Sequence, residues 1–120
     1  MSITPKILYI EDDKFFLEFY RSEFSQHQIE THFANDGEAG IAKAKELLPD
    51  VILLDIILPK MDGFDVLKAL KADGATRDIP VIILSTLGDQ DDIDRLMKDG
   101  ATKVFNKFVD LPSFVAQRVI

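Results

Sequence analysis

Three short runs of apolar residues constrain the fold of this chain more than any other feature. They cover residues 7–10, 51–54 and 81–84 and read Ile-Leu-Tyr-Ile, Val-Ile-Leu-Leu and Val-Ile-Ile-Leu. Continuous apolar runs of this length, rich in β-branched side chains, are typical of strands buried on both faces of a parallel sheet. Two more mixed segments, residues 29–34 and 103–106, are predicted to be edge strands, which gives a sheet of five strands.

Helical patterns separate the predicted strands, so strand and helix alternate five times. The predicted helices cover residues 14–24, 37–48, 64–72, 89–99 and 111–120. The first of them has phenylalanines on more than one face, and we expect most of them in the core and some of the surplus in a partner surface. Asp36 and Asp89 stand where N-caps are expected, and Gly74 and Gly100 where helices would stop. Asp13 is expected in the first turn of the first helix, where the helix dipole favours an acid. Right-handed βαβ crossovers put helices on both faces of the sheet, so the predicted fold class is α/β, a doubly wound, flavodoxin-like (βα)5 arrangement. Keeping the most apolar strands central gives the strand order 2-1-3-4-5.

Composition narrows the class of protein further. A chain of 120 residues is about one domain, and the absence of cysteine excludes disulfide scaffolds, thiol catalysis and cysteine-based zinc sites. A formal net charge of -7 argues against nucleic-acid binding by this chain. The apolar runs are far shorter than the roughly 20 residues that span a bilayer, and residues 1–5 do not read as a signal peptide. We therefore expect residues 1–120 to form one cytoplasmic domain without membrane contact. Because the last helical pattern still runs at Ile120, we also hypothesise that it is the N-terminal part of a longer protein.

Polar side chains follow four of the predicted strands, at the point where each strand ends. In chain order they are Glu11, Asp12, Asp13, Asp55, Ser85, Thr86 and Lys107. Ligands bind outside the carboxyl ends of the strands in open α/β sheets, so these groups are expected to share one rim. Two unit charges about 4 Å apart repel by roughly 4 kcal/mol at an effective dielectric constant near 20, so the carboxylates need a cation or protons. An all-oxygen donor set favours Mg²⁺, and the nearby lysine and hydroxyls then suggest a phosphoryl-transfer site.

From residue 6 to residue 119 the sequence resembles the receiver (CheY-like) domain of two-component response regulators. The matching residues are Ile10-Glu11-Asp12-Asp13, the run from Asp55 to Gly63 with Pro59, Met61 and Asp62, the pair Ser85-Thr86, and Lys107. Each piece is a weak signal alone, and the combination is specific. Pro59 and Gly63 are expected to shape the loop over the site, the proline by fixing φ and the glycine by permitting a positive φ.

The resemblance implies a magnesium site and a phosphoryl acceptor. Asp55 would be the nucleophile that takes a phosphoryl group from a histidine kinase or a phosphotransfer protein. Asp12, Asp55 and the backbone carbonyl of Ile57 would ligate Mg²⁺, and Glu11 would hold a metal-bound water. The chain would then be a signalling switch that catalyses only its own phosphorylation and dephosphorylation, and not an enzyme in the ordinary sense.

The resemblance also implies how the phosphoryl group is held and how its presence is signalled. Ser85 and Lys107 would contact phosphoryl oxygens, and the backbone N–H groups of Ile57 and Thr86 would face them. Phosphorylation would bias the surface of the fourth helix, fifth strand and fifth helix toward a downstream effector or output domain. A homodimer through that same face is a further hypothesis.

The sequence departs from the family pattern in three places. Phe108 follows Lys107 where the family usually has a proline in a cis peptide; a cis bond before a non-proline residue costs about 2.5–4 kcal/mol, so we expect a trans bond. Val104 occupies the position of the family's switch aromatic, and Phe105 should point to the opposite face of the sheet. Ile57 and Leu87 flank the acceptor with apolar side chains that cannot orient an attacking water, which predicts a long-lived phospho-Asp55.

Three other functions are alternatives to a phosphorylation switch. A pseudo-receiver, which binds partners through the same fold without phosphorylation, stays open because of Val104 and Phe108. An FMN-binding protein is disfavoured, since the Glu-Asp-Asp loop after the first strand would repel the FMN phosphate. An aspartate-dependent phosphatase is disfavoured because Ile57 stands where such enzymes usually carry a second acid.

Overall fold

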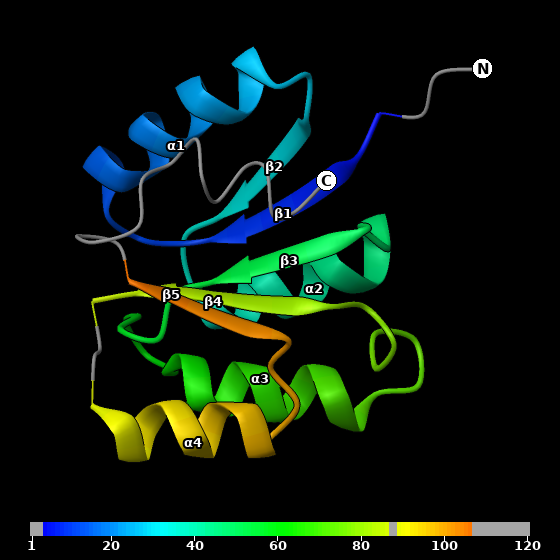
Figure 1. Cartoon of the computed structure of the whole chain (residues 1–120). Coiled ribbons are helices and arrows are strands. Elements are labelled where there is room, and N and C mark those ends of the chain that lie inside the picture. Colours follow the sequence, from blue (N-terminus) through cyan, green and yellow to red (C-terminus); the bar gives the residue numbers. More distant parts are fainter. Residues whose placement is uncertain (1–3, 87–88, 107–120) are drawn as a thin grey trace.

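The structure, a computed structural model, describes residues 4–86 and 89–106 (Figure 1). Within these ranges, strands and helices alternate along the chain, as predicted. The elements are β1 (Lys6–Ile10), α1 (Lys14–Gln26), β2 (Glu30–Ala34), α2 (Gly37–Leu47), β3 (Val51–Leu54), α3 (Gly63–Ala72), β4 (Val81–Ser85), α4 (Gln90–Lys98) and β5 (Lys103–Asn106). The predicted helix over residues 111–120 lies outside the described residues. None of the helices in the described ranges is long and apolar enough to cross a membrane.

The five strands form one parallel sheet in the order β2-β1-β3-β4-β5, which confirms the predicted order and both edge strands. Ile10 pairs with Ala34 on one side and with Leu54 on the other, so β1, β2 and β3 end level with one another. The residues that follow β1 and β3 therefore start side by side. This register brings the two acidic segments of the sequence together.

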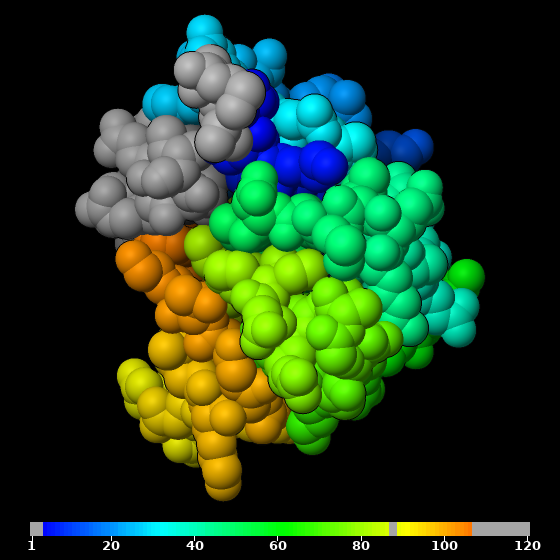
Figure 2. Space-filling model, turned by 90° about the vertical axis from the view of Figure 1, so that its right-hand side faces the viewer, coloured from blue at the N-terminus to red at the C-terminus, as the bar shows by residue number. Residues whose placement is uncertain are grey.

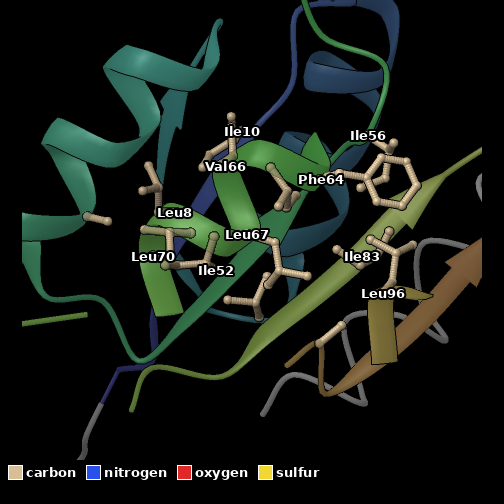
Figure 3. Packing of buried hydrophobic residues seen from close by; sticks show 14 of the residues in the cluster. Leu8, Ile10, Ile52, Ile56, Phe64, Val66, Leu67, Leu70, Ile83 and Leu96 are labelled. Carbon is tan, nitrogen blue, oxygen red and sulfur yellow. The ribbon is translucent and has the colours of Figure 1, made fainter. Parts of the chain in front are cut away.

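Helices cover both faces of the sheet (Figure 1). On one face, α2, α3 and α4 enclose a core of mainly aliphatic side chains, in which Leu67 and Leu70 of α3 pack over the central strands (Figure 3). We call this the aliphatic core. On the other face, α1 contributes Tyr20 and Phe24 to a second cluster, which we call the aromatic core and which also contains Tyr9 and Phe105.

Successive residues of each central strand enter opposite cores. In β1, Leu8 and Ile10 belong to the aliphatic core, whereas Ile7 and Tyr9 belong to the aromatic core. This two-sided burial explains why the central strands read as unbroken apolar runs. The alternation continues at the edge of the sheet, where Val104 packs against the aliphatic core and Phe105 is buried in the aromatic core. The prediction that Phe105 faces away from the side of Val104 is confirmed.

Aspartates begin the helices. Asp36 and Asp89 are N-caps, as predicted, and accept hydrogen bonds from the backbone N–H groups of Ala39 and Asp91. Asp13, expected in the first turn of α1, is the N-cap of that helix instead. Its Oδ1 accepts from the N–H groups of the second and third residues after it, at 2.8 and 3.3 Å. A short carboxylate that caps free N–H groups gains more than one lying inside the turn.

The helix ends differ from the prediction at one of two glycines. Gly100 has a φ of +112° and follows α4 as expected. α3 ends without a left-handed glycine, because Asp73 takes an extended conformation at its C-cap and its Oδ1 accepts from Ala75 N–H at 2.9 Å. An Asx turn at Asp73 therefore replaces the glycine stop that was predicted at Gly74.

The amino end of the sheet is covered by the connection between α3 and β4, which is yellow-green in Figure 2. Lys71 Nζ donates to the carbonyl oxygens of Arg77 and Ile79, at 3.0 and 2.8 Å. The buried hydroxyl of Thr76 donates to the carbonyl of Leu70 at 2.7 Å. These bonds satisfy the backbone of the connection. A cleft lined by acidic residues lies at the other end of the strands.

Candidate functional site

A cleft of about 440 Å³ opens at the carboxyl ends of the central strands. The residues that line it come from the segments after β1, β3 and β4 and from the first turn of α1. They are Glu11, Asp12, Asp13, Phe16, Asp55, Ile57, Leu58, Pro59 and Thr86. Five of the seven residues proposed from the sequence as metal- or phosphoryl-binding thus share one cleft. Ser85 lies beside it as the last residue of β4, and Lys107 lies outside the described residues.

Three carboxylates meet in this cleft. Glu11, Asp12 and Asp55 each offer an oxygen, and these oxygens all lie within 4.8 Å of one another. Glu11 and Asp55 are buried, and Asp12 is exposed. Three negative charges this close repel strongly, and burial of two of them weakens screening by water. Their chemistry fits a hard divalent cation such as Mg²⁺, which takes oxygen ligands and retains several waters.

Backbone hydrogen bonds fix the two buried acids. The N–H of Glu11 donates to the carbonyl of Ala34 at 2.9 Å, and the N–H of Asp55 donates to the carbonyl of Ile10 at 3.0 Å. The parallel ladder therefore continues one residue beyond β1 and β3. Because each acid is the first residue after its strand and still bonded to the neighbouring strand, its Cα position is set by the sheet.

The carboxylate of Glu11 is held from two sides. The buried Tyr9 hydroxyl donates to Glu11 Oε1 at 3.2 Å, and the backbone N–H of Asp13 donates to Oε2 at 3.2 Å. Burial, and then the charge of Glu11, raise the pKa of the Tyr9 phenol far above its ordinary value, so the hydroxyl remains a donor. Tyr9 was not predicted from the sequence to belong to the site. The signal was available, since residues two apart on a strand share a face.

The loop after β3 brings the backbone of Ile57 to the acceptor. The N–H of Ile57 points to Asp55 Oδ1 in a long contact of 3.4 Å. The Ile57 side chain is 58% exposed, so an apolar group stands at the mouth of the cleft. The N–H is thus already directed at the carboxylate, and it would face any group joined to that oxygen.

The glycine that follows this loop acts differently from the prediction. Gly63 was expected to supply a positive φ, but the left-handed residue of the loop is Lys60, with a φ of 69°. A Cβ at Gly63 would lie 2.5 Å from the carbonyl oxygen of Asp55 and 2.5 Å from the Cα of Ile56. The N–H of Gly63 also donates to the carbonyl of Ile56 at 2.8 Å. Glycine is required because the start of α3 packs directly on the backbone of the acceptor.

Ser85 ends β4 with a buried hydroxyl. Its Oγ has no hydrogen-bond partner among residues 4–86 and 89–106. Leaving a buried hydroxyl unpaired costs about 1–3 kcal/mol, so this group can gain by accepting a new partner. Thr86, next along the chain, is partly buried at the cleft. Leu87 and the Lys107–Phe108 bond, on which two predictions rest, lie outside the described residues.

Aromatic side chains extend from the cleft along α1. Phe16 lines the cleft and packs against the aromatic core. Phe15 is 67% exposed and Phe19 46% exposed, with their ring centroids 5.7 Å apart. The surplus of phenylalanine that the sequence shows in this segment is therefore divided between the core and the surface. That the exposed part binds a partner stays a prediction.

Comparison with known proteins identifies the family. The model of the response regulator receiver domain matches residues 7–117. The chain belongs to this family. As a receiver domain, it is part of two-component signalling, in a family whose members accept phosphoryl groups and are not classical enzymes.

Receiver-containing relatives cover most of this chain. The DNA-binding dual master transcriptional regulator RpaA of Synechocystis is 36% identical over 94% of the chain, which spans 47% of that protein. The response regulator PleD of Caulobacter vibrioides is 33% identical over 90% of the chain, which spans 24% of PleD. The chain thus covers about half or less of these two relatives. The polar-differentiation response regulator DivK of Brucella ovis is 30% identical over 94% of the chain and is itself covered to 92%.

Solved receiver structures share the fold. The Francisella response regulator 1452 receiver domain has a TM-score of 0.88 and 30% identity, with 97% of this chain and 93% of that chain covered. The chemotaxis response regulator CheY4 of Vibrio cholerae also has a TM-score of 0.88, at 26% identity, with 98% of this chain and 100% of that chain covered. The predicted flavodoxin-like fold class is confirmed, both by these likenesses and by the observed strand order.

Proposed function

We propose that this receiver domain is a phosphorylation switch that accepts a phosphoryl group on Asp55, with Mg²⁺, from a histidine kinase or a phosphotransfer protein. The observation that carries the proposal is the convergence of Glu11, Asp12 and Asp55 within 4.8 Å in an open cleft. Asp55 is one of the two buried acids and follows the central strand β3. A carboxylate there is accessible from the cleft and held at a defined position by the sheet.

The acids divide into an acceptor and cation ligands. Asp12, Asp55 and the carbonyl of Ile57 would hold Mg²⁺ directly, and Glu11 would hold one of its waters. The ion would supply charge neutralisation, which lets an anionic carboxylate approach an anionic phosphoryl group. The oxygen-only donor set of the cleft supports this choice of metal.

The transfer itself is a substitution at phosphorus. An oxygen of Asp55 forms the new bond to phosphorus while the bond between phosphorus and the donor's imidazole nitrogen breaks, and that nitrogen keeps the electron pair. The product is an acyl phosphate, a covalent intermediate of the kind that carboxylate nucleophiles form. The N–H of Ile57, 3.4 Å from Asp55 Oδ1, would then face the phosphoryl group. We propose the Thr86 N–H and the Lys107 ammonium as further contacts.

Ser85 would respond to the phosphorylation of Asp55 by forming a hydrogen bond with the phosphoryl group. Its buried hydroxyl lacks a partner among the described residues, and a phosphoryl oxygen would satisfy it. The expected consequence is a shift at the end of β4 that biases the surface of α4, β5 and the segment after them toward an effector or an output domain. A homodimer through this face is a further part of the proposal.

A pseudo-receiver, active as a binding module without phosphorylation, is the second candidate. One observation favours it: Val104, at the family's switch position, is not aromatic, and the neighbouring Phe105 is buried on the opposite face. Since Val104 has no aromatic ring, a shift at Ser85 cannot be transmitted by rotation of a ring at this position. If phosphorylation is signalled at all, it must be signalled through other contacts.

Incubation with acetyl phosphate and Mg²⁺, followed by intact-mass measurement and peptide mapping, separates the two candidates. The switch requires one added phosphoryl group that is lost in Asp55→Asn and lost without Mg²⁺. Absence of incorporation, together with no detectable Mg²⁺ binding, would exclude the switch and leave the binding module.

Our proposal also covers the wider setting of the domain. We propose that residues 1–120 are one receiver domain, that it works in the cytoplasm, and that a longer regulator contains it. The relatives RpaA and PleD, of which this chain spans 47% and 24%, support the last point. With a net charge of -7, we propose that this domain itself does not contact nucleic acid.

A further inference from the structure

We infer that Tyr9 is a positioning residue for the cation site, acting through its hydrogen bond to Glu11. The inference rests on the proposed role of Glu11 toward Mg²⁺ and deepens it. Tyr9 itself does not line the cleft and is fully buried under α1. Its hydroxyl reaches the site through a hydrogen bond to Glu11 Oε1, at 3.2 Å.

Packing fixes the direction of the Tyr9 hydroxyl. The ring stands edge-on to Tyr20, with centroids 5.7 Å apart and an interplanar angle of 83°, and lies 6.3 Å from the ring of Phe33. A ring held between two others cannot swing away from the strand without disturbing the aromatic core. The oxygen at its tip is therefore directed at one place, the carboxylate two residues farther along β1.

The hydrogen bond restricts a side chain that would otherwise be free to choose among rotamers. Glutamate loses considerable rotamer entropy when it is ordered, and a carboxylate among two others is repelled by them. A hydrogen bond from the phenol to Oε1 and one from Asp13 N–H to Oε2, both at 3.2 Å, offset part of these costs before any cation arrives. Groups that hydrogen-bond to the direct ligands of a metal orient those ligands, and their loss weakens metal affinity by roughly 10- to 100-fold in other proteins. Tyr9 lies one step farther from the ion, because Glu11 would hold a water of the ion, so we expect an effect at the lower end of this range.

Two tyrosines and no tryptophan make the test direct. Tyr9 and Tyr20 are both fully buried in the aromatic core, and substitution of either one by phenylalanine removes its hydroxyl oxygen and leaves the ring. Tyr9→Phe removes the bond to Glu11, and Tyr20→Phe is the matched control in the ring beside it. The binding of Mg²⁺ alone is measured by titration calorimetry on the wild type, on both variants, on Glu11→Gln and on Tyr9→Phe/Glu11→Gln, after chemical denaturation has shown that each is folded.

We expect Mg²⁺ to bind about tenfold more weakly to Tyr9→Phe, which is the lower end of the 10- to 100-fold range given above. We expect Tyr20→Phe to bind Mg²⁺ with unchanged affinity. The double variant should bind like Glu11→Gln alone, because Tyr9 acts only through that carboxylate. Tyrosine emission supplies a second readout. A carboxylate that is hydrogen-bonded to a phenol quenches the emission of that tyrosine. Mg²⁺ should therefore change the emission of the wild type and of Tyr20→Phe, and should leave the emission of Tyr9→Phe unchanged.

Three results would overturn the inference. Unchanged affinity in Tyr9→Phe, with normal wild-type binding, would remove the positioning role and leave the proposed function intact. Equal weakening in Tyr9→Phe and Tyr20→Phe would make the effect one of core packing. No Mg²⁺ binding by the wild type would instead overturn the proposed function, and this inference with it.

Discussion

The two faces of the sheet are built from different side chains. The aliphatic core under α2, α3 and α4 consists almost wholly of leucine, isoleucine, valine and alanine. The aromatic core under α1 contains both tyrosines and several phenylalanines. The aromatic side sends a hydrogen bond from its interior to an acid of the cleft, from Tyr9 to Glu11. The buried side chains of the aliphatic core are apolar and stabilise the fold by packing, whereas the aromatic core also contains a polar group that is joined to the site.

The largest expected effect follows from cutting into the aliphatic core. Leu67 is fully buried against the central strands, so Leu67→Ala should lower the free energy of unfolding by about 2–5 kcal/mol. Urea denaturation measures this loss. The variant that remains folded should bind Mg²⁺ like the wild type, because the buried side chains of this core are apolar and offer the acids no hydrogen bond. A loss of Mg²⁺ affinity in the folded fraction would contradict the division between the two faces.

Gly63 tests the place where the aliphatic side meets the acceptor. Gly63→Ala puts a Cβ against the backbone of Asp55 and Ile56, so we expect a loss of about 1–3 kcal/mol in the free energy of unfolding and slower phosphorylation by acetyl phosphate. Gly74→Ala is the control, since a Cβ there meets nothing within 4 Å. Equal behaviour of the two variants would show that the close approach at Gly63 is unimportant.

The mouth of the cleft, where Ile57 lies, is tested by the lifetime of phosphorylated Asp55. Ile57→Gln places an amide that can orient water at the mouth of the cleft, where the wild type exposes an apolar side chain. We expect phospho-Asp55 to decay roughly tenfold faster, which corresponds to about 1.4 kcal/mol of activation free energy. Intact mass followed over time after removal of the phosphodonor measures the decay. Ile57→Leu should behave like the wild type, and a wild-type half-life already as short as that of the glutamine variant would refute the prediction.

The smallest effect is expected on the outer surface of the aliphatic side. The bond from Ala75 N–H, and then Lys45 at 2.9 Å, lower the pKa of Asp73 below its ordinary value of 3.8. A carboxyl with a depressed pKa stabilises the fold above its unfolded pKa and loses that contribution as pH falls through the folded pKa. Asp73→Asn should therefore be slightly less stable than the wild type at pH 7 and equal to it in acid below the pKa. A thermal-unfolding difference that grows toward low pH would contradict the sign.

Much of the fold could be predicted because both faces of the sheet are buried. Because the central strands are buried on both faces, they appear in the sequence as apolar runs such as residues 51–54. The edge strands appear as mixed segments. The convergence of Asp12 and Asp55 followed from the rule that parallel strands end at one edge. These inferences needed only the chain direction and the pattern of apolar residues.

The parts that failed depend on contacts between segments. Gly63 reads as a turn residue until its distance to the Asp55 backbone is known, and Tyr9 reads as one more core aromatic until its hydroxyl is located. Asp13 was placed one position too far into its helix because a cap and a first-turn acid have the same sequence signal. Sequence patterns report which face a residue occupies, and they do not report which atom it meets there.

The tight contact at Gly63 also limits how the chain can change in length. The loop from Ile57 to Asp62 is largely exposed, and exposed loops usually tolerate insertions and deletions. This one is closed at its base, where Gly63 N–H donates to the carbonyl of Ile56 at 2.8 Å. Because Gly63 lies against the carbonyl of Asp55, the start of α3 has no room to move when a residue is gained or lost between these two points. The loop therefore has fixed ends, and only its exposed residues can take up a change in length.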